Sequence, residues 1–207
     1  MPNVMDAIKS RRSTRKYSSK PIPARVLKEI LEAAQWAPSA HNAQPWRFII
    51  LTEEPATKAF AKTMAEEWQR DLATDKVDAA SREKMATSSI KRLTNAPVLV
   101  LACITMKDMK KYEDTKRQEI ERALAVQSLG AAIQNLLLAA HAKGLGACWL
   151  CAPAFCKDAV KKALRIPEDF EPQALITLGF SAEKPTMPTR KPFEDVFHFN
   201  QFDGKQQ

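Results

Sequence analysis

The sequence is poor in glycine and histidine, with only five glycines and three histidines among 207 residues. Gly144 and Gly146 follow an expected helix rather than a strand, which excludes a glycine-rich dinucleotide loop, and no P-loop motif is present. The histidines stand at no metal-ligand spacing, and neither a Gly-x-Ser-x-Gly motif nor a marked acidic pair occurs. The sequence therefore predicts no metal site and marks no side chain as a catalytic acid, base or nucleophile.

The chain has four cysteines, and one pair is closely spaced. Cys148 and Cys151 have the spacing of a redox pair or of half a zinc site, but no second Cys or His pair accompanies them. The pair also ends a strand-like segment, whereas a thioredoxin-like pair opens a helix. We interpret the cysteines as buried free thiols of a reducing compartment, and a redox role for Cys148 and Cys151 stays open.

Long hydrophobic runs are missing as well. The apolar stretch Leu129–Ala142 is interrupted by polar residues and is shorter than a membrane span. The first residues do not have the charged-then-apolar order of a secretory leader. We expect a cytoplasmic protein with no membrane partner.

Length and charge narrow the class further. The 207 residues, 45% of them hydrophobic, are enough for one well-buried core, and we expect a single domain over residues 1–207. The net charge of +8 is compatible with nucleic acid, but no zinc finger, aromatic RNA-binding signature or basic tail accompanies it. We expect this positive charge to attract anionic cofactors and cosubstrates, and we expect no nucleic-acid partner.

Hydrophobic periodicity predicts helices and strands that alternate irregularly. The expected helices are Asn3–Ser10, 23–37, one or two within Pro55–Thr94 with a break near Thr74-Asp75, Gln118–Lys143 and Pro153–Leu164. The expected strands are Arg47–Thr52, Pro97–Thr105, Ala147–Cys151 and Gln173–Phe180. The helix from Gln118 is apolar on nearly every face after Ala123, which indicates that a second subunit covers one side. The proline- and phenylalanine-rich tail after Ser181 suggests the same partner.

Two segments are suited to an anionic, aromatic cofactor. Arg11-Arg12-Ser13-Thr14-Arg15 packs three guanidiniums and two hydroxyls into five residues, a combination that binds phosphate oxygens, although a solvated basic turn is the alternative. The segment 37–46, Ala-Pro-Ser-Ala-His-Asn-Ala-Gln-Pro-Trp, offers amides and backbone groups between prolines. Such groups can bind the pyrimidine edge of a flavin, although an ordinary helix-to-strand loop is commoner.

These two segments together resemble the nitroreductase family of FMN-dependent oxidoreductases. The first matches the family's Arg-Arg-Ser-x-Arg-x-aromatic pattern through Tyr17, and the second matches its Pro-Ser-x-x-Asn-x-Gln-Pro-Trp pattern. The resemblance implies an α+β fold: a central mixed, mainly antiparallel sheet flanked by helices, with a long central helix and a C-terminal tail that wraps the partner of a homodimer.

The resemblance also implies which residues bind FMN. The phosphate and ribityl chain would contact the first motif, and Arg190, in an Arg-x-Pro sequence, would return to the phosphate. The backbone after the long helix would approach flavin N5 and O4, although a cysteine stands where the family often has glycine. Gln127 is either a contact to the flavin's polar edge or a satisfied core amide. The implied cofactor-binding residues are Arg11, Arg12, Ser13, Arg15, Pro38, Ser39, Ala40, Asn42, Gln127, Cys151, Ala152 and Arg190.

The function implied by the resemblance is hydride transfer from NADPH or NADH through flavin N5 to a small electrophilic acceptor, by a ping-pong mechanism. The acceptor would be a nitroaromatic, a quinone, a flavin or an enone. Three alternatives stay open: a dehalogenase or flavin-dependent oxidase, an FMN-binding protein without turnover, and a basic nucleic-acid-binding module. The segment 55–94 is expected to shape the substrate mouth.

Overall fold

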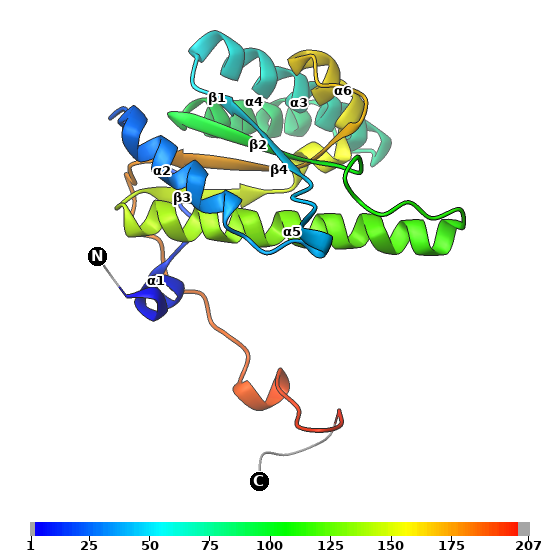
Figure 1. Cartoon of the computed structure of the whole chain (residues 1–207). Coiled ribbons are helices and arrows are strands. Elements are labelled where there is room, and N and C mark those ends of the chain that lie inside the picture. Colours follow the sequence, from blue (N-terminus) through cyan, green and yellow to red (C-terminus); the bar gives the residue numbers. More distant parts are fainter. Residues whose placement is uncertain (1–2, 203–207) are drawn as a thin grey trace.

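Helices and strands alternate along residues 3–202, the part of the chain that the computed structural model describes (Figure 1). The predicted domain of residues 1–207 therefore includes ends that lie outside the described residues. The helices are α1 Val4–Ser10, α2 Ala24–Gln35, α3 Glu54–Thr74, α4 Ala79–Thr94, α5 Thr115–Ala142 and α6 Lys157–Leu164. The strands are β1 Trp46–Leu51, β2 Val98–Thr105, β3 Gly146–Leu150 and β4 Phe170–Gly179, and short 3-10 turns are η1 Ala40–Asn42, η2 Ala152–Phe155 and η3 Phe193–Asp195. The predicted α+β class is confirmed.

The four strands form one sheet in the order β1-β2-β4-β3, and each neighbouring pair is antiparallel. β3 is therefore an edge strand. One parallel contact adds to this sheet, an isolated bridge between Ser13 and Ala147 of β3. The N-terminal arginine segment thus lies along the free edge of β3.

Both faces of the sheet are covered, as the unbroken apolar run of β2 predicts. All eight β2 residues are buried, and alternate side chains enter different cores. Val98 and Val100 pack with α2 and α5, whereas Leu99 and Leu101 pack with residues of α3, α4 and α6. Figure 1 shows α5 on one side of the sheet and α3, α4 and α6 on the other.

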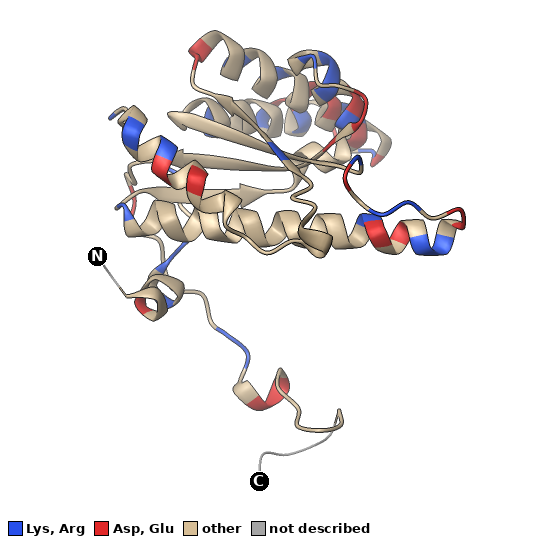
Figure 2. Cartoon of the chain, in the orientation of Figure 1, with Lys and Arg blue, Asp and Glu red and all other residues tan. Residues whose placement is uncertain are grey.

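The long helix α5 has 28 residues, about 42 Å at 1.5 Å per residue. The Asp114 side chain caps it by accepting from the Arg117 N–H at 2.9 Å, and Gly144 ends it with a left-handed φ of 76°. Beyond its first turns, the helix has no charged residues (Figure 2).

By length and composition alone, the whole of α5 could cross a membrane, because the helix begins well before the apolar stretch Leu129–Ala142. Within the fold, 44% of its most apolar window is buried, and α5 covers one face of the sheet. Core helices of soluble proteins meet the same criterion, and this position is that of a core helix.

The burial of α5 is not complete in a single chain. Ala123 and Gln127 are exposed, and 51% of Ile120 is exposed. The tail after Ser181 also leaves the body of the chain (Figure 1), and its aromatic side chains lie largely in solvent. Its predicted contact with a second subunit stays a prediction.

Candidate functional site

The arginine segment is extended and lies directly against β3. The Thr14 N–H donates to the Ala147 carbonyl at 2.9 Å, beside the bridge between Ser13 and Ala147. A Cβ atom added to Gly146 would lie 2.6 Å from the Thr14 side chain, so glycine is required for this close approach. The fold thereby fixes the backbone from which the arginine side chains project.

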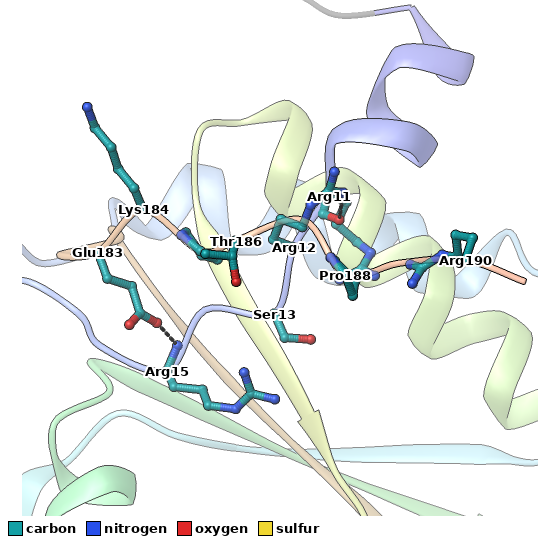
Figure 3. Close-up of a pocket in the computed structure, with 10 residues that line it drawn as sticks. Arg11, Arg12, Ser13, Arg15, Glu183, Lys184, Thr186, Pro188 and Arg190 are labelled. Carbon is teal, nitrogen blue, oxygen red and sulfur yellow. Dashed lines mark hydrogen bonds between the residues drawn. The ribbon is translucent and has the colours of Figure 1, made fainter.

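Tyr17 and Glu183 hold the other end of the same segment. The Tyr17 hydroxyl is buried, 2.5 Å from the Thr14 carbonyl oxygen and 2.6 Å from the Thr177 hydroxyl. Burial raises the pKa of Tyr17, so the phenol keeps its proton. The Glu183 carboxylate accepts from the backbone N–H of Arg15 at 2.6 Å, as the dashed line in Figure 3 shows. Sequence reasoning missed Glu183, because its partner is 168 residues away.

The predicted phosphate-binding residues line one cavity of about 630 Å³, the basic cavity. Arg11, Arg12, Ser13 and Arg15 enter it from the N-terminal segment, and Arg190 enters from the tail (Figure 3). With Lys184, five cationic side chains line the cavity, against the single carboxylate of Glu183. Guanidiniums in this number suit a doubly charged phosphate, to which each can donate two hydrogen bonds.

Two further sets of contacts surround the arginines of this cavity. The Arg12 Nη1 donates to the carbonyls of Lys9 and Arg11, both at 2.7 Å, which fixes the direction of the guanidinium. His141 lies 2.7 Å from the Ser10 hydroxyl, and burial, together with the charges of Arg11 and Arg12, lowers the His141 pKa. His141 is therefore held beside the arginine segment in an environment that disfavours its protonated form.

A second cavity, of about 490 Å³, is lined by the helical hairpin of α3 and α4 and by the residues that follow β3. It is called here the hairpin cavity. It contains the predicted residues Cys151 and Ala152, and Arg92 is the one cation among its lining residues. Sequence reasoning expected the segment 55–94 to shape the substrate mouth, but it missed which residues line this cavity, because the two surface helices of the segment have ordinary amphipathic patterns. The missed residues are Met64, Trp68, Asp71, Asp75, Ser89, Arg92, Phe155 and Cys156.

β3 connects the two cavities. Its first residues pair with the arginine segment of the basic cavity, and Cys151 directly follows its last residue. A strand of five residues covers about 17 Å. A ligand with a charged group at one end and a planar ring at the other can lie along such an edge.

The cysteines are all free, but they do not share one environment. Cys103 and Cys148 are buried, as predicted. The prediction of a buried thiol is wrong for Cys151, which follows the end of β3 and is exposed at the hairpin cavity, and Cys156 is only half-buried.

The second predicted motif forms a strained turn, the 39–44 loop. His41, Asn42 and Gln44 have left-handed φ angles of 56°, 52° and 47°. Each costs a non-glycine residue roughly 1 kcal/mol, less for asparagine. The Ser39 hydroxyl partly offsets this cost by accepting from the Gln44 N–H at 3.0 Å.

The 39–44 loop rests on α5. The Ala40 N–H donates to the Ser128 hydroxyl at 3.1 Å, and the His41 Nε2 lies 3.1 Å from the Glu121 carboxylate. Within the described part of the chain, no residue of Pro38–Asn42 lines the basic or the hairpin cavity. The loop therefore presents Pro38 and Asn42, both exposed, to the outside of the chain.

Gln127 is exposed on α5, so the alternative that it is a satisfied core amide is wrong. The side chain points away from the core because it lies one position before the buried Ser128. It lines neither of the two cavities in the described structure, and its role toward a flavin stays a prediction.

Comparison with known proteins decides the family. The model of the nitroreductase family matches residues 8–180. The chain belongs to the nitroreductase family. A putative NADH dehydrogenase/NAD(P)H nitroreductase of Methanothermobacter thermautotrophicus is 30% identical over 185 residues, which cover 88% of this chain and 80% of the relative.

Solved structures agree with this nitroreductase fold. A BluB-like flavoprotein from Clostridium difficile superposes with a TM-score of 0.81 at 25% identity, covering 97% of this chain and 100% of that one. A putative nitroreductase from Desulfovibrio desulfuricans, solved in complex with FMN, gives a TM-score of 0.71 at 27% identity, covering 95% and 96%.

Proposed function

We propose that this nitroreductase family member binds FMN along the edge of β3 and transfers electrons from NADH or NADPH to a small electrophilic acceptor. The observation that carries the proposal is the basic cavity, where arginines from two ends of the chain meet. An FMN-bound relative and relatives named as NAD(P)H nitroreductases support it.

The basic cavity would hold the FMN phosphate. Arg11, Arg12, Arg15 and Arg190 supply bidentate donors, and the Ser13 hydroxyl adds a further one. One oxygen of the Glu183 carboxylate, Oε1, accepts from the backbone N–H groups of Arg15 and Lys16, which holds the turn in place. The donor set and its rigid backbone fit a phosphate monoester.

The hairpin cavity would hold the ring. When bound, FMN supplies the hydride chemistry, and the protein supplies position and electrostatics. Backbone groups at Cys151 and Ala152 are available to the N5 and O4 edge, and the Arg92 guanidinium can stabilise negative charge on the pyrimidine edge. Trp68 and Phe155 give the cavity flat apolar walls suited to an aromatic acceptor.

The site is completed by a second copy of the chain in this proposal. The 39–44 loop faces outward, where it can reach the flavin of a partner subunit. Large apolar side chains are exposed in the single chain: Trp36 is 86% exposed, and Phe193 and Phe197 of the tail are each 56% exposed. A homodimer would bury them. NAD(P)H and the acceptor would then use one shared site in turn, which is a ping-pong sequence.

An anaerobic visible spectrum tests the proposed function. Protein saturated with FMN should lose its flavin absorption on addition of NADH or NADPH and regain it on addition of a quinone or nitroaromatic. Flavin that stays oxidised with both nicotinamides would overturn the reductase proposal, and the better reductant would identify the preferred nicotinamide.

Light scattering on a size-exclusion column tests the dimer. The wild-type chain should have twice the 23.2 kDa mass of one chain. Phe193→Ala with Phe197→Ala removes a stacked pair whose ring centroids are 4.5 Å apart, and it should weaken the dimer. A monomeric wild-type protein that still binds FMN would contradict the proposed shared site.

A further inference from the structure

The conformation of the 39–44 loop needs support from elsewhere in the fold. Among the described residues, six non-glycine residues have a positive φ, and three of them lie in this loop. A loop with this many left-handed residues populates its conformation poorly unless neighbouring elements hold it. Its long-range side-chain contacts therefore decide how well the loop is ordered.

Glu121 supplies the most unusual of these contacts. Glu121 is one of the buried residues of α5, and only 3% of it is exposed. One carboxylate oxygen lies 3.1 Å from the His41 Nε2, and the other has no hydrogen-bond partner in the described structure. A buried carboxylate is unfavourable without a donor, so the contact with His41 compensates the burial of Glu121.

A second anchor lies two turns further along the same face of α5. The Ser128 hydroxyl accepts from the Ala40 N–H and donates to the Leu124 carbonyl at 2.7 Å. Residues 121 and 128 are seven positions apart, which places them on one helix face. The two α5 side chains therefore contact adjacent loop residues, Ala40 and His41, which directly precede Asn42.

We propose that His41 and Glu121 form a positioning pair that orders the 39–44 loop for flavin binding. The inference rests on the proposed function, since Asn42 and its neighbours are the groups presented to the flavin. The contribution of the pair is preorganisation: the loop is ordered before the flavin arrives, and binding does not have to order it.

Flavin affinity in a double-mutant cycle tests the pair. Glu121→Leu and His41→Leu should each raise the FMN dissociation constant about tenfold, as for loss of one hydrogen bond to a charged group. The double variant should bind FMN with about the same dissociation constant as the single variant that binds it less tightly, because each change removes the same contact. Glu121→Gln keeps an acceptor for the imidazole N–H and should stay within about threefold of the wild type. Fluorescence quenching of FMN measures the dissociation constants of the wild type and the four variants.

Controls separate positioning from folding. Glu119→Leu, an exposed change on the same helix, should leave FMN affinity unchanged. His41→Leu leaves the buried Glu121 carboxylate without its donor, and this variant could fail to fold for that reason. Glu121→Leu removes the carboxylate itself, so the comparison of Glu121→Leu with Glu121→Gln still tests the pair. Unchanged FMN affinity in Glu121→Leu, or equal losses in Glu121→Leu and Glu121→Gln, would overturn the pair. A wild-type protein that binds no FMN would instead overturn the proposed function.

Discussion

The two ends of the candidate site are built in different ways. The basic cavity takes Arg11, Arg12, Ser13 and Arg15 from one short segment, whereas the hairpin cavity takes its walls from α3, α4 and η2. The basic end carries five cations against one carboxylate, whereas the hairpin end carries one cation, Arg92, and the carboxylates of Asp71 and Asp75 beside apolar side chains. In our account, affinity for FMN is therefore concentrated at one end and control of the chemistry at the other.

The largest expected effect is at the basic end. Arg12→Ala with Arg15→Ala should raise the FMN dissociation constant at least about 100-fold, because two charge-assisted contacts of about 1.5–3 kcal/mol each are lost. Equilibrium dialysis of the purified variant with FMN measures this. Arg25→Ala with Lys28→Ala removes the same charge from exposed ion pairs on α2 and serves as the control. Stoichiometric flavin in the first variant would show that the phosphate lies elsewhere.

The hairpin end should separate chemistry from binding. Arg92→Met should keep most bound FMN but slow flavin reduction by NADH or NADPH about tenfold, which corresponds to roughly 1.4 kcal/mol less stabilisation of the charged ring. A midpoint potential lower by about 30 mV should accompany it. The neighbouring exposed Lys91, changed to Met, is the matched control. An Arg92→Met protein with an unchanged potential would remove Arg92 from the ring site.

An acid-sensitive link among α5, β4 and α6 should stabilise the fold outside both ends of the site. Burial raises the pKa of Glu171, but hydrogen bonds from Arg122 of α5 and Lys157 of α6 outweigh it and lower the pKa to about 2. This stabilisation is fully present above pH 4.5 and is lost as the pH falls toward 2. Glu171→Gln should therefore lower the free energy of unfolding by about 1 kcal/mol at pH 7, and the difference should shrink at pH 3.

Urea denaturation at the two pH values measures this difference. Glu168→Gln, which loses an ion pair whose carboxylate side chain is 95% exposed, should change stability little at either pH. A Glu171→Gln effect of equal size at pH 7 and pH 3 would mean that the ion pairs are not its cause.

The smallest expected effect is a difference in labelling at the hairpin cavity. Iodoacetamide at pH 8 should modify the exposed Cys151 first. Burial, and then the charges of Glu67 and Asp71, raise the pKa of Cys156 to about 11, so this thiol should react slowly. Bound FMN should slow Cys151 labelling several-fold, as followed by mass spectrometry. Equal rates with and without FMN would place the ring away from Cys151.

The fold and the basic end could be predicted because their signals are local. Hydrophobic periodicity located the helices and strands. The helix predicted from Asn3 begins at Val4, and the Asn3 side chain caps it by accepting from the Asp6 N–H at 2.9 Å. The arginine segment is contiguous in the sequence, and its resemblance to the family added Arg190, which the structure places in the same cavity.

The rest depends on contacts between distant residues that carry no local signal. Arg92 is an ordinary cation in the last turn of α4 until the α3–α4 hairpin is placed beside η2. Glu183 and Glu121 are single acidic residues whose partners lie 168 and 80 positions away. The polar residues Glu121 and Ser128, seven positions apart on one face of a largely apolar helix, were the available hint of the loop anchor.

The most direct test of the central claim compares FMN with riboflavin, which lacks the phosphate, by titration calorimetry on the same protein. If the basic cavity holds the phosphate and the hairpin cavity holds the ring, FMN should bind at least about 100-fold more tightly than riboflavin. This preference should disappear in the variant with Arg12→Ala and Arg15→Ala. Equal affinities of the wild-type protein for FMN and riboflavin would contradict the account.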